Sequence, residues 1–214
     1  MNPALRFFNP DAVVKTTGDR LPHWDQLGAT FFITFRLADS VPQDALRAYV
    51  REHRQWEEAH PSRPWPPEVE DAYRRKFTRR FERWLDRGAG ECLLRDPANG
   101  EIVADALRHF EGERSLLHAW VVMPNHVHVL VSLVGETTLG GLLHAWKGFT
   151  ARKINERRGR AGSIWQKSYF DRLVRDWEHF ARCARYIRAN PSKAELPAGE
   201  FLQGESELVR RVLA

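Results

Sequence analysis

Apolar positions along the chain mark out a β-hairpin. Two apolar runs, residues 116–123 and 127–133, are separated by a short connection that contains a proline and an asparagine. Runs of this length between turn-forming residues are typical of two strands joined by a tight turn. Residues 29–37, rich in β-branched and aromatic residues, predict a first strand, and residues 164–174 predict a further one.

Apolar residues at helical spacing predict the helices between these strands. Their expected positions are about residues 42–54, 68–86, 101–112, 138–157 and 177–190. Proline disfavours a helix interior, so the proline-rich stretch at residues 60–67 breaks residues 42–88 into a charged, largely helical section with a loop. The last helix is expected to begin after Asp176, a good N-cap, and to stop before Pro191.

The order of these elements predicts an α+β fold. It runs strand, helical section, helix, strand, strand, helix, strand, helix. The economical arrangement is a ferredoxin-like antiparallel sheet with helices packed on one face. Since 214 residues suffice for one core, we expect residues 1–214 to form a single domain with a charged helical insertion at about residues 42–88.

Composition narrows the class of protein. Apolar residues make up 43% and charged residues 29%, as in soluble globular chains. No stretch approaches the roughly 20 apolar residues of a membrane span. Residues 1–19 also lack a run suited to a signal peptide, so we expect a cytoplasmic protein without a membrane partner. Cys92 and Cys183 form no CxxC, which favours two reduced thiols over a disulfide framework or a zinc site.

Positive charge is concentrated in one part of the chain. Residues 141–193 hold 13 Lys/Arg and 4 Asp/Glu, a net charge of +9, although the whole chain carries only +5. Such a distribution fits a face that follows the phosphates of a nucleic acid. The alternative, ordinary solvated helix faces, is the one that composition alone favours.

A histidine pair, His126 and His128, is the first candidate site. Positions i and i+2 of a strand point to the same side, so the two imidazoles lie close enough to share one metal ion, while Val127 and Val129 point to the other side. The motif is short, and with nine histidines in 214 residues chance supplies about 0.4 such pairs per chain. The alternative is a pair of edge histidines that bind water or neighbouring groups.

The last predicted helix carries the second candidate site. Its expected buried stripe is Phe180, Cys183, Ala184 and Ile187, flanked by a polar line of His179, Arg182, Tyr186 and Asn190. Tyr186 and Asn190 are one turn apart on the same side. A phenol that could attack a phosphate thus stands beside an amide oxygen that could bind a metal. The alternatives are an amphipathic tyrosine at a helix border and an asparagine that ends the helix before Pro191.

Three segments resemble blocks of a known transposase family. Residues 120–130, WVVMPNHVHVL, look like the histidine–hydrophobic–histidine signature of the HUH single-tyrosine (IS200-like) transposases. Residues 164–172, IWQKSYFDR, and residues 186–196, YIRANPSKAEL, look like the downstream blocks of the REP-associated tyrosine transposases. The blocks stand in the family's order, and the resemblance covers roughly residues 20–196.

The resemblance implies a ferredoxin-like fold and a transposase that cuts single-stranded or hairpin DNA. It implies His126 and His128 as ligands of a divalent metal, Mg²⁺ or Mn²⁺, and Tyr186 as the nucleophile, with Asn190 where the family's third polar group falls. It also suggests a homodimer, located in the cytoplasm and on the bacterial nucleoid when bound to DNA. Residues 42–88 depart from the compact family pattern, so they give no direct expectation for hairpin recognition.

The hypothesis for the mechanism follows from these roles. The metal polarises the scissile phosphate, and Tyr186 attacks phosphorus to form a covalent 5′-phosphotyrosine that a 3′-hydroxyl can later reverse. Tyr49 and Tyr169 compete for the nucleophile's role; Tyr186 is preferred because one helix brings it and Asn190 to the metal together. No residue stands out as the general base, and His179 is a weak candidate.

The expected contacts with nucleic acid come from the basic helix and the segment after it. They are Lys147, Arg152, Lys153, Arg157, Arg158, Trp165 and Lys167. The cationic side chains would bind phosphates, and Trp165 would stack on unpaired bases. Trp146 and Phe170 could also stack, although we favour core positions for both.

Two other classes of function stay open at this point. The first is a catalytically inactive, domesticated nucleic-acid-binding protein of the same fold. The second is a metal-dependent hydrolase that uses water, with Tyr186 in a structural role; the lack of an Asp/Glu-rich cluster near His126 disfavours it.

Overall fold

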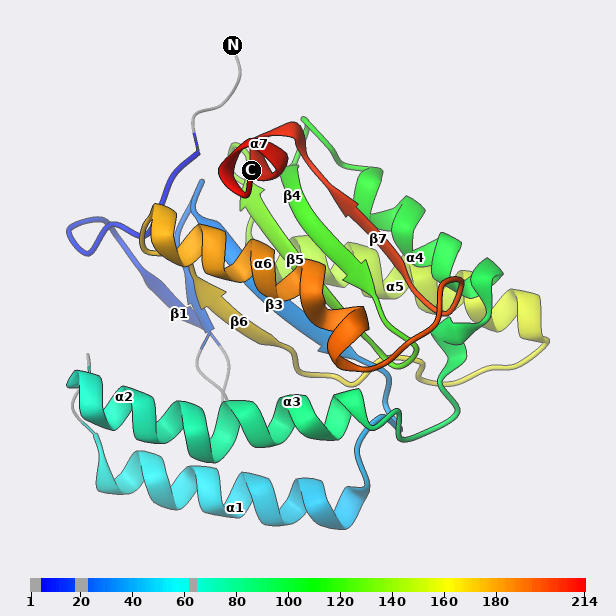
Figure 1. The fold of residues 1–214 in the computed structure, drawn as a ribbon, viewed down its shortest axis with the longest axis horizontal. Helices are drawn as coiled ribbons and strands as arrows, with labels where there is room; N and C mark the ends of the chain where they lie inside the picture. Colours follow the sequence, from blue (N-terminus) through cyan, green and yellow to red (C-terminus); the bar gives the residue numbers. More distant parts are fainter. Residues whose placement is uncertain (1–4, 18–22, 62–64) are drawn as a thin grey trace.

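A five-stranded antiparallel sheet forms the centre of the molecule. The computed structural model describes residues 5–17, 23–61 and 65–214. The strands lie in the order β6-β3-β5-β4-β7 (Figure 1). Their bounds are β3 Thr30–Arg36, β4 Ser115–Val122, β5 His126–Leu133, β6 Phe170–Leu173 and β7 Leu202–Glu205. The α+β class with an antiparallel sheet is therefore confirmed.

Strands β4 and β5 form the hairpin that the apolar runs predict. Val122 pairs with Val127, and the turn is closed by the hydrogen bond from Met123 N to His126 O, 2.8 Å long. On its other side β5 pairs with β3, which sets Thr34 opposite His128. The hairpin thus places the histidine pair at the start of β5, the central strand of the sheet.

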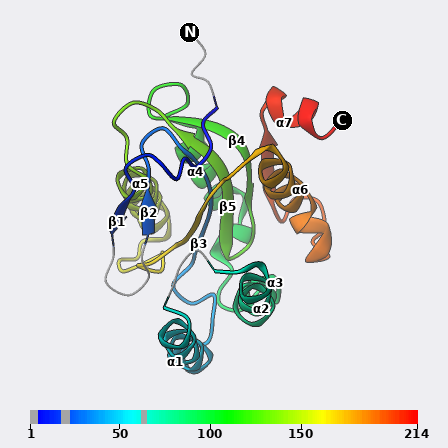
Figure 2. The same ribbon diagram turned by 90° about the vertical axis from the view of Figure 1, so that its left-hand side faces the viewer.

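Helices cover both faces of the sheet, whereas the sequence predicts helices on one face only. Helices α4 (Pro97–Arg108) and α5 (Leu139–Arg158) lie on one side, and α6 (Trp177–Lys193) and α7 (Glu207–Val212) lie on the other (Figure 2). The one-face expectation is wrong because every residue of β5 is buried. A strand that is apolar and buried on both sides needs a layer of helices over each face.

Two apolar clusters fill the space between these layers. Val127 and Val129 belong to the cluster under α4 and α5, together with Trp146. Leu130 belongs to the cluster under α6 and α7, together with Phe180 and Ile187. By the alternation of a strand, His126 and His128 therefore face α6.

The section at residues 42–88 is helical, as the sequence predicts, and packs against one end of the sheet. It comprises α1 (Gln43–Ala59), α2 (Pro67–Tyr73), the π-helical segment Arg74–Thr78 and α3 (Arg79–Asp86). Helix α1 runs antiparallel to α2 and α3 (Figure 1), and Phe77 is buried against Tyr49 and Trp56. The guanidinium of Arg36, at the end of β3, lies 5.3 Å from the ring centre of Phe81.

Several smaller features complete the fold. Strands β1 (Lys15–Thr17) and β2 (His23–Asp25) form a separate antiparallel pair. Sequence reasoning missed this pair, β7 and α7, because their short segments carry too few residues to show a period. Both cysteines are buried and free of disulfide bonds, as expected. Across the described residues, no helix has the length and apolar character needed to span a membrane.

Candidate active site

The histidine pair lies at the start of β5, beneath α6. His126 and His128 are 1% and 2% exposed, and their Nε2 atoms are 3.0 Å apart. Burial lowers the pKa of His126 to about 3 and also holds the pKa of His128 well below its usual value. Both imidazoles are therefore neutral near pH 7, the form in which a histidine nitrogen can bind a metal.

Each imidazole is oriented through its Nδ1 atom. His126 Nδ1 lies 2.8 Å from Asn125 Oδ1, and His128 Nδ1 lies 2.7 Å from Thr34 Oγ1. The amide nitrogen of Asn125 donates to the carbonyls of Leu85 and Ala89, so its oxygen faces His126 as an acceptor. His126 therefore carries its proton on Nδ1 and presents an Nε2 lone pair toward His128.

Helix α6 brings Tyr186 against this pair. The Tyr186 ring lies edge-on to His128, with 5.2 Å between ring centres, and also edge-on to Phe32 at 5.7 Å. Asp176 caps the helix by accepting from His179 N at 2.7 Å. The expected buried stripe is confirmed, since Phe180, Cys183, Ala184 and Ile187 all face the sheet.

The helix does not stop before Pro191, as the sequence predicts, but continues to Lys193. Pro191 lies in the last turn, where the loss of one backbone N–H removes a single helical hydrogen bond. Asn190 therefore sits inside the helix, one turn after Tyr186, and is 1% exposed. Its Oδ1 atom has no hydrogen-bond partner among the described residues. A buried oxygen without a partner is costly, and a bound water or ligand would satisfy it.

Helix α3 adds two carboxylates that sequence reasoning missed. The side chain of Glu82 hydrogen-bonds Tyr186, which also hydrogen-bonds Asn190. Because Asn190 Oδ1 is unpartnered, the amide nitrogen of Asn190 donates to the phenol oxygen, and the phenol donates to Glu82. No local pattern marks Glu82 within a charged helix, and only the packing of α3 against α6 brings it to the tyrosine.

Burial and charge act together on these groups. Burial, followed by the charges of Glu82 and Asp86, raises the pKa of Tyr186, so the phenol is protonated at neutral pH. Burial also raises the pKa of Glu82 and of Asp86. The ammonium of Lys193 lies 4.8 Å from the centre of the Tyr186 ring. The tyrosine thus needs a proton acceptor at close range, and Glu82 is placed to be one.

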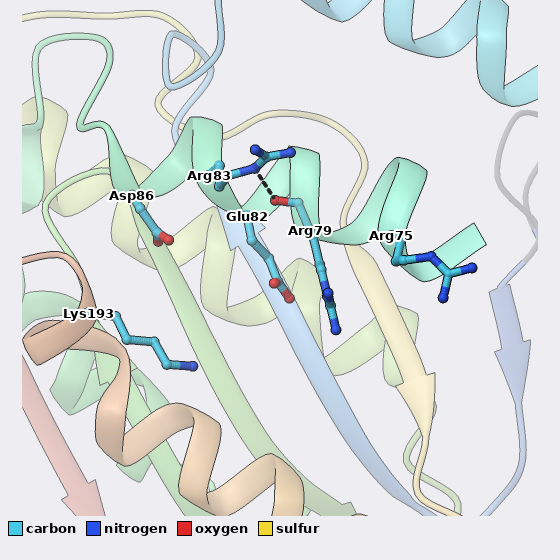
Figure 3. A pocket seen from close by; sticks show the side chains of 6 residues that line it. All are labelled: Arg75, Arg79, Glu82, Arg83, Asp86 and Lys193. Atoms are coloured by element: carbon cyan, nitrogen blue, oxygen red, sulfur yellow. Dashed lines mark hydrogen bonds between the residues drawn. The ribbon is translucent and has the colours of Figure 1, made fainter. Parts of the chain in front are cut away.

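A pocket of about 560 Å³ opens between α3 and the C-terminal end of α6 (Figure 3). Its lining residues are Arg75, Arg79, Glu82, Arg83, Asp86 and Lys193. Glu82 projects into the gap, and Asp86 and Lys193 face one another from the two helices. Within the described part of the chain, no three His, Cys, Asp or Glu residues are grouped to hold a metal.

The other tyrosines and the suggested base lie elsewhere. Tyr49 packs among the aromatic rings of the helical section. Tyr169 packs against the cluster under α4 and α5, on the opposite face of the sheet from His128. His179 is buried, and its Nδ1 accepts a hydrogen bond from Arg175 N. The hydrogen bonds of Tyr186 go to Glu82 and Asn190 instead.

The expected nucleic-acid contacts lie on or beside α5, across the sheet from the histidine pair. Lys147 donates to the carbonyls of Gln166 and Lys167, and burial lowers its pKa to about 8. Four of these expected contact residues form ion pairs. Arg152 and Lys153 pair with Glu156, Arg157 pairs with Asp96, and Arg158 pairs with Glu91. Binding of DNA by this face stays a prediction.

The prediction that Trp165 stacks on unpaired bases is wrong. It is 4% exposed, packs against Phe35, and its Nε1 donates to Thr150 Oγ1. The ring is a part of the core and has no free face on which a base could stack. Trp146 is also core, as favoured from the sequence, whereas Phe170 is half-buried on the α6 side.

The fold and the site define a class of protein: α+β proteins in which a helix places a tyrosine against a buried histidine pair. A comparison with known protein families identifies a similar family. Residues 100–190 match the model of the family described as "Transposase IS200 like". This region, which contains the histidine pair and the tyrosine helix, is similar to the IS200-like transposases, in agreement with the resemblance seen in the sequence.

Solved structures add two similar chains. One is a REP-associated tyrosine transposase bound to a REP hairpin, with 16% identity, a TM-score of 0.45, and coverage of 82% of this chain and 74% of that one. Another is a chain from Deinococcus radiodurans R1 described as a putative transposase, with 16% identity, a TM-score of 0.32, and coverage of 75% and 89%. No curated protein matches the chain.

Proposed function

We propose that this protein is a transposase that cuts and rejoins single-stranded or hairpin DNA through a covalent 5′-phosphotyrosine at Tyr186. One observation carries the proposal. Tyr186 lies against the buried pair His126 and His128, with ring centres 5.2 Å apart at His128, and its neighbour Asn190 has an unpartnered buried oxygen. The match of residues 100–190 to the IS200-like family supports DNA as the partner.

The residues present fit a divalent metal. The Nε2 atoms of His126 and His128 are 3.0 Å apart, close enough for one ion, since metal–nitrogen bonds are about 2.0–2.1 Å long. Asn125 and Thr34 hold the rings from behind, as groups behind metal ligands commonly do. Asn190 Oδ1 would complete the set. Two nitrogens and one oxygen suit Mn²⁺ at least as well as Mg²⁺. When bound, the metal would polarise the scissile phosphate and stabilise charge on the leaving oxygen.

The chain's own residues would carry out the proton and group transfer. Tyr186 Oη attacks phosphorus, and its proton moves to the Glu82 carboxylate, which already accepts a hydrogen bond from it. The bond from phosphorus to the 3′ oxygen breaks, and the new bond to Tyr186 keeps the phosphate in a diester. A 3′-hydroxyl can later attack that diester and return the proton to the phenolate, so joining needs no nucleotide cofactor.

The remaining parts of the proposal concern the whole molecule. Residues 1–214 would form one transposase domain, with α1, α2 and α3 as an insertion before the family region. The protein would act in the cytoplasm, on the nucleoid, as a homodimer. The exposed cations near α5, Arg152, Lys153 and Lys167, would bind phosphates outside the cleavage site.

A labelling experiment tests the chemistry. The protein is incubated with Mn²⁺ or Mg²⁺ and with hairpin-containing single-stranded DNA labelled at its 3′ end, and the products are separated on a denaturing gel. We expect a labelled protein band with the wild type and with Tyr169→Phe, and no such band with Tyr186→Phe or His126→Ala.

The outcomes separate the classes of function. An adduct in Tyr186→Phe would contradict the assigned nucleophile, and full activity of His126→Ala would contradict the metal site. Cleavage without an adduct, retained in Tyr186→Phe, would indicate a hydrolase that uses water. Binding without cleavage by the wild type would indicate the inactive nucleic-acid-binding protein.

A further inference from the structure

We propose that Arg75, Arg79 and Arg83, together with Lys193, bind the phosphate backbone of a single nucleic-acid strand and lead it to Tyr186. The inference rests on the proposed function, which supplies the reason for a strand to reach this tyrosine. The family match begins at residue 100, so these arginines lie in a part of the chain outside that match.

Arg79 and Arg83 lie on α3, four residues apart, so they recur about once per turn, at an interval of about 6 Å along the axis. Arg75 lies four residues before Arg79, in the π-helical segment Arg74–Thr78 that runs into α3. All three line the same pocket (Figure 3). Such local distortions of a helix are frequent at functional sites.

These arginines differ from the basic residues of α5 in their lack of ion pairs within the described structure. Within the described residues, Arg75, Arg79 and Arg83 form no ion pair, whereas Arg157 and Arg158 are each bound to a carboxylate. All three side chains are exposed. The only hydrogen bond that one of them makes in the described structure runs from Arg83 Nε to the Arg79 carbonyl. Their guanidinium groups are therefore free to bind an anion.

The pocket has cations on both of its sides. Lys193 faces the arginine row from the end of α6, and Glu82 and Asp86 lie between them, so the lining groups sum to a net charge of +2. Arg172, on β6, acts electrostatically on Glu82 and adds positive charge on the sheet side. The positive field thus extends along α3 and ends at the carboxylate that hydrogen-bonds Tyr186.

The dimensions favour one strand over a duplex. A pocket of about 560 Å³ has the size of an ordinary ligand site and is bounded by two helices. A duplex would need room for two backbones, with a major groove about 12 Å wide between them. A single strand can lay successive phosphates along the arginine row and still present one phosphate to Tyr186.

A binding experiment tests the strand site separately from cleavage. All proteins carry Tyr186→Phe, and binding of a fluorescent single-stranded oligonucleotide is followed by anisotropy over a series of salt concentrations. Replacing Arg75, Arg79 and Arg83 by Gln should lower the slope of log affinity against log salt by about 2, since each phosphate contact on a single strand contributes about 0.7. The matched control replaces Arg95, Arg210 and Arg211 by Gln, which removes the same charge at exposed, ion-paired positions outside the pocket.

The expected result is a loss of slope in the Gln variant of Arg75, Arg79 and Arg83 that clearly exceeds the loss in the control. A variant with Lys at the same three positions keeps the charge and should keep the slope. An unchanged slope in the first Gln variant, an equal loss in both Gln variants, or an equal loss in the Lys variant would overturn the proposal. Equal losses for single-stranded and duplex DNA would overturn the assignment to one strand. Absence of an adduct with wild-type protein contradicts the proposed function. It does not affect the strand site, because the salt slopes are measured with proteins that cannot cleave.

Discussion

At the scale of single residues, the polar groups behind the histidine pair explain how its two rings are held. Thr34 and Asn125 each contact one Nδ1 atom, at 2.7 and 2.8 Å, and leave the Nε2 atoms facing one another. Neither residue could be selected from the sequence. Thr34 is one of several threonines in strands, and only the pairing of β3 with β5 sets it opposite His128.

Thr34→Val should therefore weaken metal binding without unfolding the protein. Valine has nearly the same shape, but it cannot hydrogen-bond His128, and loss of such a supporting contact lowers metal affinity by roughly 10- to 100-fold. Titration with Mn²⁺, followed by calorimetry, measures the affinity. Thr30→Val, a change at another buried threonine of β3, should leave it unaltered. Equal affinities in Thr34→Val and the wild type would contradict the role given to Thr34.

Glu82 is the second residue whose role depends on contacts between distant segments. If it accepts the phenol proton, Glu82→Gln should slow adduct formation by roughly 10²- to 10⁴-fold. A base acts in its deprotonated form, and burial raises the pKa of Glu82. The wild-type rate should therefore fall with acid at a pH above the ordinary glutamate range, and Glu82→Gln should lack this acid limb. Single-turnover rates over a pH series provide the measurement.

Asp86→Asn is the matched control for this prediction. Asp86 lies on the same helix, and burial raises its pKa too, but no hydrogen bond joins it to Tyr186 in the structure. Its variant should keep the acid limb of the pH profile. A profile of Glu82→Gln that matches the wild type would show that the proton goes elsewhere.

At the scale of elements, the β4–β5 hairpin concentrates buried histidines. His118 on β4 hydrogen-bonds Ser132 at 2.7 Å and packs edge-on to Phe180, on the same side of the sheet as His126 and His128. Burial lowers the pKa of His118 to about 4 and of His126 to about 3. The apolar runs predict the hairpin because its signal is local, but the environment of these histidines depends on α6.

The hairpin should make the protein sensitive to mild acid. The folded-state pKa of His118 lies below its unfolded value of 6.5, so the unfolded chain binds more protons between those values. Stability is therefore full above about pH 6.5 and falls as the pH drops toward 4, by on the order of 3 kcal/mol from His118 alone.

Chemical denaturation at pH 7.5 and pH 5 measures this loss. His118→Gln, which does not titrate, should reduce the difference between the two pH values, although it lowers stability at both. The exposed His144 on α5 is a control, and His144→Gln should leave the difference unchanged. An identical pH dependence in His118→Gln and the wild type would contradict the prediction.

At the scale of the whole molecule, the site is assembled from three regions that are far apart in the sequence. The hairpin supplies the histidines, α6 supplies Tyr186 and Asn190, and α3 supplies Glu82. All three lie within one chain, and the Tyr186 and His128 rings are 5.2 Å apart. A tyrosine so placed can act together with the histidine pair of its own subunit, whatever the oligomeric state.

Mixing two inactive variants should therefore fail to restore activity. Tyr186→Phe retains the histidines, and His126→Ala retains the tyrosine, so a mixture can form an adduct only if a tyrosine serves the histidines of another subunit. We expect no adduct after the two variants are unfolded and refolded together. The reference is a mixture of wild type with one inactive variant, treated in the same way. If the mixture of the two inactive variants forms an adduct at a level approaching this reference, α6 of one subunit acts on the histidines of another.

The sequence by itself determined the class of fold, the helical character of residues 42–88, and the residues of the candidate histidine pair and tyrosine helix. These features follow from local periods, since strands repeat every two residues and helices every 3.6. Tertiary structure decided that helices cover both faces, that Trp165 is core and that Asn190 lies within α6 with an unpartnered oxygen. It also decided that Glu82 reaches Tyr186 and that three arginines line the pocket beside Glu82. These facts depend on which faces pack together, and contacts between distant segments leave no period along the chain.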